Sequence, residues 1–151
     1  MIINKIIGNI EDFDESEINK RHIEKVNLES DQLVKRIQRL TTDHDRVIGL
    51  QLTDKRDLAN GDILHMDEQN IIMVNVLSDE LLIIQPKDME EMGRVAHELG
   101  NRHLPAQFEG SEMLIQYDYL TERLLQEMKL TFVKEKRQVK HAFRHIGHSH
   151  D

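Results

Sequence analysis

The side chains with the clearest capacity for chemistry are the histidines, of which the chain has nine. Four of them, His141, His145, His148 and His150, stand close together at the end of the sequence. Neutral imidazole is a good ligand for zinc, copper and nickel. In an extended segment His148 and His150 project to the same side, so these two are candidate ligands of one divalent ion. A helical segment would instead align His141, His145 and His148, although Gly147 disfavours a helix there.

Another histidine, His103, follows a segment with strong helical character, DMEEMGRVAHELGN. Asp88, with Glu91 three residues later, predicts a capping box at the start of a helix. Apolar residues at 89, 92, 96 and 99 repeat at the spacing of one helix face, and position 103 is the next on that stripe. Gly93 and Gly100 lie on a neighbouring face and leave room for another backbone. His103 is therefore a candidate metal donor, and the alternative is a core histidine whose ring nitrogens are satisfied.

A single imidazole cannot complete a metal site, because tetrahedral or octahedral coordination needs about four to six donors. In a two-fold dimer, a residue near the axis meets its own copy. If the helix that carries the glycines packs near such an axis, two copies of His103 face one ion, and the histidines at the chain end can add further donors. A site that is exposed and assembled in this way suits carrying a metal better than catalysis.

Composition excludes several other classes of function. The net charge of -8 argues against nucleic acid as a partner, since binding phosphates needs a surplus of lysine and arginine. The chain has no cysteine, so it forms neither disulfides nor thiolate metal sites, which is compatible with the cytoplasm. The start, MIINKIIGNI, is unlike a signal peptide. The apolar runs Ile71–Val74 and Leu81–Ile84 are far shorter than the roughly 20 residues of a membrane helix, so we expect a soluble protein without a membrane contact.

The first half of the chain reads as β-structure. Short segments rich in Ile, Val and Leu alternate with turn residues, as in a small sandwich or barrel. We therefore predict an N-terminal all-β domain over residues 1–76, with a loop at Glu11–Lys20. The predicted strands are Met1–Ile7, His22–Leu28, Leu33–Arg39, Arg46–Leu52, Asp62–Met66 and Ile71–Leu77.

The second half alternates strands and helices. Two helices, capped by Asp88 and Asp118, separate strands at Glu80–Gln85, at a hairpin of 104–108 with 113–117, and from Leu130 to Val133. The order βαββαβ is that of a ferredoxin-like domain, which we place at residues 77–140. Residues 141–151 are predicted to be a flexible tail that contains histidine. The fold class is therefore α+β.

The motif Gly100-Asn101-Arg102-His103, with Glu91-Met92-Gly93 before it and Gly147-His148-Ser149-His150 after it, resembles the UreE family of urease accessory proteins. The resemblance covers the whole chain. It implies that His103 is the central nickel ligand at a dimer interface and that His148 and His150 are tail ligands, with His145 as a third candidate.

The same resemblance implies a homodimer that carries Ni²⁺ in the cytoplasm. It implies transfer of nickel to a urease accessory GTPase and delivery to apo-urease, with the β domain in contact with partners. The residues alone do not rank nickel above Zn²⁺ or Cu²⁺, since imidazole binds all three. His97 lies about 240° from His103 around a helix and is expected at the surface or at an interface. We interpret His22, His44 and His65 as structural or solvated.

Two other functions compete with that of a nickel carrier. His97-Glu98 begins the HExxH signature of zinc hydrolases, but Asn101 stands where the second histidine is required, so no enzyme is predicted. The second alternative is a protein-binding scaffold or chaperone with incidental histidines, or a general buffer of zinc and copper. Titration with nickel separates a carrier from a scaffold, because a scaffold has no saturable site.

Overall fold

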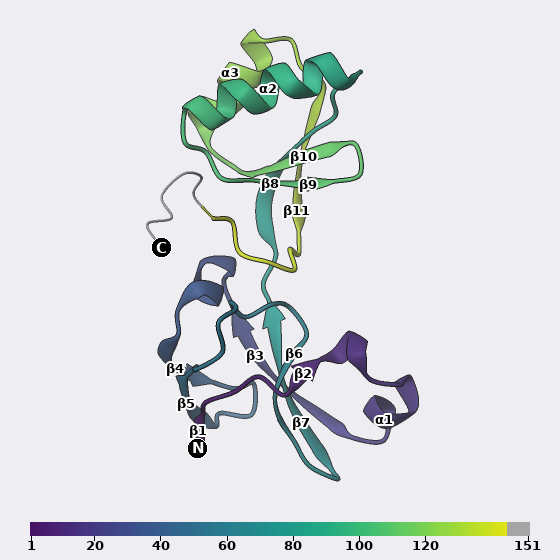
Figure 1. The fold of residues 1–151 in the computed structure, drawn as a ribbon, viewed down its shortest axis with the longest axis vertical. Coiled ribbons are helices and arrows are strands. Elements are labelled where there is room, and N and C mark those ends of the chain that lie inside the picture. The colour runs from purple at the N-terminus through teal and green to yellow at the C-terminus, as the bar shows by residue number, and fades with distance from the viewer. Residues whose placement is uncertain (145–151) are drawn as a thin grey trace. The chain divides into compact units, whose positions relative to one another are not determined.

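The computed structural model describes residues 1–144 and is an α+β protein, as predicted. The chain divides into two compact units, which are described separately (Figure 1). The first unit consists of Met1–Ser78 and Gln138–Ala142, and the second contains Asp79–Arg137 and the described residues 143–144. No helix in this part of the chain is long and apolar enough to cross a membrane.

The first unit is built mainly from two sheets. In the larger sheet, β3 (His22–Leu28) pairs in parallel with β7 (Asn70–Val76), and β6 (Asp62–Met66) joins β7 to the short β2 (Gly8–Asn9). The smaller sheet has the order β1-β5-β4. Its strands are β1 (Ile2–Ile3), β4 (Ile37–Thr41) and β5 (Val47–Gln51). The bounds of β3 and β6 are those predicted from the sequence.

Three segments of the first unit differ from the prediction. The expected strand Met1–Ile7 is wrong, because only β1 and, further on, β2 pair with neighbouring strands. Leu33 belongs to the 3₁₀ helix η2 (Ser30–Val34) instead of a strand. The segment Glu11–Lys20 is not a loop but contains η1 (Ile10–Asp12) and α1 (Glu15–Asn19). Local hydrogen bonds explain η1, since Asn9 and Asp12 close a capping box, and α1 buries Ile18.

The segment Gln138–Ala142 returns to the first unit. The Asn60 amide donates to the Lys140 carbonyl at 2.8 Å, and the Gln138 side chain donates to the Val76 carbonyl at 2.8 Å. Val139, an isolated apolar residue in a polar stretch, is buried. These contacts are long-range, which is why the sequence analysis grouped residues 138–140 with the second half of the chain.

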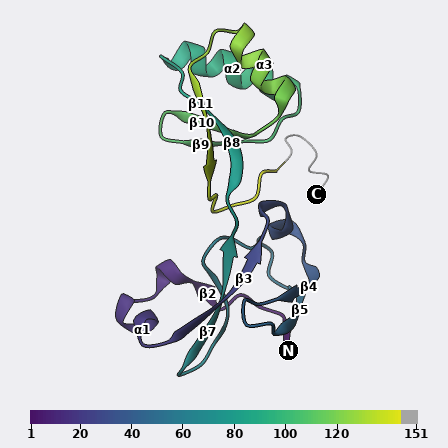
Figure 2. The same cartoon turned by 180° about the vertical axis from the view of Figure 1, so that it is seen from behind.

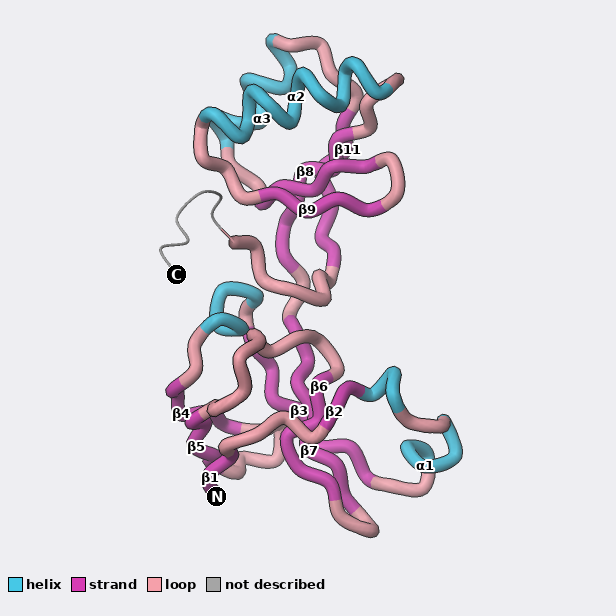
Figure 3. The backbone as a smooth tube through the Cα atoms, in the orientation of Figure 1, coloured by secondary structure: helices cyan, strands magenta, loops and turns pink. Residues whose placement is uncertain are grey.

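The second unit confirms the predicted βαββαβ order. Its four-stranded antiparallel sheet has the order β11-β8-β10-β9, and both helices lie on one face of it (Figure 2). The sheet and helices are coloured separately in Figure 3. The elements are β8 (Asp79–Ile84), α2 (Met89–Asn101), β9 (Ala106–Glu109), β10 (Glu112–Gln116), α3 (Tyr119–Glu127) and β11 (Phe132–Arg137).

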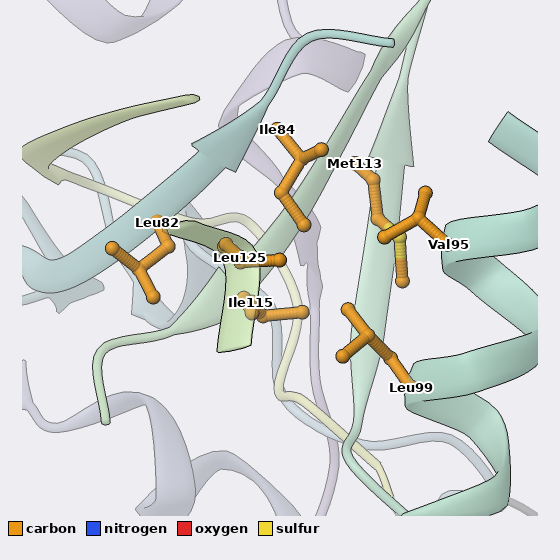
Figure 4. Close-up of a cluster of buried hydrophobic side chains, with 7 residues drawn as sticks. All are labelled: Leu82, Ile84, Val95, Leu99, Met113, Ile115 and Leu125. Carbon is orange, nitrogen blue, oxygen red and sulfur yellow. The ribbon is translucent and has the colours of Figure 1, made fainter. Parts of the chain in front are cut away.

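An apolar core joins the helices to the sheet in this unit. Side chains of β8 and β10 meet those of α2 and α3 (Figure 4). The cluster consists of Leu82, Ile84, Val95, Leu99, Met113, Ile115 and Leu125. The edge strand β11 extends four residues beyond the predicted end at Val133, to Arg137. The sequence Lys-Glu-Lys-Arg gave no strand signal, because it is charged, as edge strands often are, and lacks an alternation of apolar residues.

Candidate metal centre

The helix α2 positions the candidate ligand His103. The Asp88 carboxylate caps the helix by accepting the Glu91 amide at 2.8 Å, as predicted. In the predicted capping box, the Glu91 side chain would accept the Asp88 amide. It accepts the amide of the preceding residue, Lys87, instead. Leu99 of the predicted stripe is fully buried, as is Val95, which the stripe did not include, whereas Met89 is 89% exposed in the first turn. The apolar stripe therefore anchors the end of the helix that leads to His103, and its predicted start at Met89 was wrong.

His103 lies beyond the helix, in a left-handed turn. Its φ is +60°, its amide donates to the Gly100 carbonyl at 3.0 Å, and the Leu104 amide donates to the Leu99 carbonyl at 3.2 Å. This pair of bonds is the Schellman motif that ends many helices. Leu104 packs on the core beside Leu99, as the motif requires. The prediction that His103 continues the apolar stripe is therefore wrong, because the helix ends at Asn101 and the backbone is left-handed at His103.

The consequence is an exposed imidazole on a firmly held backbone. Glycine is the usual residue at this position, and another side chain costs on the order of 1 kcal/mol. Histidine is tolerated there more often than most residues. The interpretation of His103 as a core histidine is thus excluded, while its assignment as a metal donor stays a prediction.

The face of α2 that carries the glycines is open in the described part of the chain. A Cβ atom added at Gly93 or Gly100 would meet no atom within 4 Å. The exposed surface around them carries the ion pairs Arg94–Glu90 at 2.7 Å and Arg102–Glu98 at 3.2 Å. Another backbone can therefore approach this face closely, as expected for a dimer contact.

The described residues contain no cluster of three or more His, Asp or Glu side chains that could hold a metal ion. His97 is exposed and lies 3.4 Å from the Asn101 amide, in agreement with the expected surface position. The predicted ligands His145, His148 and His150 lie outside the described residues. Among the described residues, a metal ion at His103 would therefore need further donors, which a second copy or the chain end would have to supply.

The structure also joins two histidines that the sequence analysis treated separately. His22 and His44 approach within 2.6 Å through their Nε2 atoms. His22 begins the strand predicted at 22–28, and His44 lies in the turn between the strands predicted at 33–39 and 46–52. The missing information was the pairing of that turn with that strand, which no local pattern carries.

Comparisons with known proteins cover both units. Residues 3–77 match the family model described as the UreE urease accessory protein, N-terminal domain, and residues 79–151 match the model of its C-terminal domain. The urease accessory protein UreE of Staphylococcus saprophyticus is 57% identical over all of both chains. The proteins of the same name from Geobacillus kaustophilus and Lachnoclostridium phytofermentans are 55% and 51% identical, over 100% and 99% of each chain.

The two matched domains define the class of protein, an accessory protein of urease that acts in urease maturation and is not itself a catalytic enzyme. The chain belongs to the UreE family. The family thus predicted from Gly100–His103 and its flanking motifs is confirmed.

Proposed function

We propose that this protein is a nickel metallochaperone, which binds Ni²⁺ between two copies of His103 and delivers it to apo-urease. The observation that carries the proposal is the place of His103, an exposed imidazole on a rigid cap beside the open glycine face of α2. Membership of the urease accessory family supports nickel as the cargo and apo-urease as its destination.

A homodimer follows from the chemistry of the single donor. Two imidazoles related by a two-fold axis supply two ligands, and His148, His150 and His145 of the chain ends, or water, supply the rest. A site with few fixed ligands releases its ion readily, which suits transfer to a urease accessory GTPase in the cytoplasm. Zn²⁺ and Cu²⁺ also bind imidazole, so the specificity for nickel comes in part from the partners.

The first test is a nickel titration of the full-length protein by calorimetry, with the oligomeric state followed by light scattering. We expect one tight ion per dimer. His103→Ala should lower the affinity of this site at least about 100-fold, since two ligands are lost at once, whereas His65→Ala, a control in the first unit, should leave it unchanged. Replacing His145, His148 and His150 with alanine should reduce the number or affinity of further ions.

The proposal fails if His103→Ala binds nickel like the unchanged protein. Absence of saturable binding at one ion per dimer would instead favour a scaffold with incidental histidines. Nickel binding that persists while the protein stays monomeric would refute the shared site.

A further inference from the structure

Two imidazoles of the first unit face each other at the surface. His22 is the first residue of β3, and His44 lies in the turn between β4 and β5. Their Nε2 atoms are 2.6 Å apart, and the ring centroids are 4.8 Å apart with an interplanar angle of 71°. Both residues are exposed. The reactive nitrogens of the two rings therefore point to one accessible spot.

The backbone holds the turn against β3. The Asp43 amide donates to the Lys25 carbonyl at 2.8 Å, and the Lys25 amide donates to the Asp43 carboxylate at 2.9 Å. Within the turn, the Thr42 hydroxyl accepts the amides of His44 and Arg46. The position of His44 is therefore fixed by the turn and by the strand together.

An ion pair beside the histidines fixes how the turn that carries His44 is aligned along β3. The Glu24 carboxylate, only 2% exposed, accepts two bonds from the Arg46 guanidinium at 2.7 and 3.2 Å. Alternate residues of a strand project to the same side, so Glu24 and His22 face the same way. The pairing of Glu24 with Arg46 thereby sets His44 opposite His22.

A carboxylate orients one of the rings. The Nδ1 atom of His44 lies 2.6 Å from the Asp43 carboxylate, and in the tautomer that donates from Nδ1 the Nε2 lone pair is directed at His22. This relay of carboxylate, histidine and lone pair is the arrangement that orients histidine ligands in metal sites.

We propose that His22 and His44 form a second metal site, which binds a divalent cation of the zinc, nickel and copper class within a single chain. Metal–nitrogen bonds of about 2.0–2.1 Å place two ligand nitrogens roughly 3.0–3.4 Å apart, so the exposed rings need to separate by less than about 1 Å. Water completes the coordination, because no third His, Asp or Glu joins them among the described residues. The site therefore exchanges its ion easily and depends on neither His103 nor dimer formation.

Zinc is the probe for the test, because it is diamagnetic and suits NMR of histidine side chains. In the full-length protein and in His103→Ala, we expect the ring signals of His22 and His44 to shift together at less than one equivalent of Zn²⁺. His22→Gln should weaken zinc binding at His44 at least tenfold. Asp43→Asn should weaken it about tenfold, because the amide oxygen can still accept the Lys25 amide but orients the ring less strongly.

The matched control is His65→Gln. His65 also lies beside a carboxylate, with Nε2 at 3.2 Å from Asp67, but it does not face a second imidazole in the described structure. This variant should keep the zinc response of His22 and His44 unchanged.

The proposal is overturned if neither ring responds up to one zinc per chain, or if the rings respond to pH alone, which would make them a pair that shares a proton. Loss of the response in His103→Ala would also overturn it. Failure at this site leaves the proposed function intact, since the nickel test at His103 uses different residues.

Discussion

The two units present histidine in opposite ways. In the first unit, His22 and His44 meet within one chain, and a strand, a turn and an ion pair hold them together. In the second unit, His103 is exposed just beyond the end of α2, beside a glycine-bearing face that is open in the described part of the chain. A pair of ligands in one chain can bind metal without assembly, whereas a single ligand makes binding depend on a second copy. For the two proposed sites, metal binding is therefore expected to depend on dimer formation in the second unit only.

The means of support differ as well. The first unit buries two carboxylates, Glu24 and Asp62, each paired with an arginine. In the described part of the second unit, Thr121 is the buried polar residue, and the core is otherwise apolar. Buried ion pairs thus help to align distant segments in the first unit. In the second unit, apolar packing and helix caps have this role.

The largest expected effect on stability comes from removing the Arg46 guanidinium, which pairs with the buried Glu24 carboxylate. Arg46→Ala leaves the Glu24 carboxylate buried without its guanidinium, which should destabilise the first unit by about 2–3 kcal/mol. It should also release the turn and weaken zinc binding at His22 and His44. Urea unfolding followed by NMR signals of each unit measures the first effect, and zinc titration measures the second.

Arg94→Ala is the control in the second unit. It removes an ion pair with Glu90 whose side chains are 67% and 80% exposed, so stability should change by less than about 0.5 kcal/mol. Equal losses for the two variants would show that burial does not distinguish the two units.

The features that the sequence could predict are those set by nearby residues, and they lie mainly in the second unit. The caps at Asp88 and Asp118 and the βαββαβ order depend on neighbours within a few residues, and the structure confirms them. The contact of His22 with His44 depends on how a turn docks on a distant strand, and no periodicity reveals it. The left-handed turn at His103 was missed for another reason, since glycine, its usual signal, is absent there.

The open face of α2 gives the next prediction. Gly93→Gln and Gly100→Gln should each stabilise the isolated chain by up to about 0.5 kcal/mol, because glutamine favours a helix and its Cβ meets nothing there. The same changes should weaken the proposed dimer at least tenfold by blocking close approach. Sedimentation equilibrium gives the dimer constant, and thermal unfolding gives the stability.

The result that distinguishes this prediction is a gain in thermal stability together with a weaker dimer. A dimer constant that is unchanged in both variants would place any subunit contact elsewhere and remove the route by which two copies of His103 meet. The zinc response of His22 and His44 should be unaffected, since it needs only one chain.

The last prediction compares two helix ends, because α3 ends in the same motif as α2. Lys129 has a φ of +57°, its amide donates to Gln126 at 3.0 Å, and the Leu130 amide donates to Leu125 at 3.1 Å. His103→Gly and Lys129→Gly should therefore each stabilise the second unit by about 0.5–1 kcal/mol, as glycine relieves the left-handed strain. Thermal unfolding compares the gains.

Only the change at His103 should cost nickel affinity, although the two positions share their backbone geometry. His97→Gly provides the reference within α2, where glycine should lose about 1 kcal/mol because the residue is helical. If His103→Gly is less stable than the unchanged protein while Lys129→Gly is more stable, the His103 ring contributes to folding as well as to binding. Equal gains with loss of nickel in His103→Gly alone would show that this histidine occupies a glycine position for the sake of the metal.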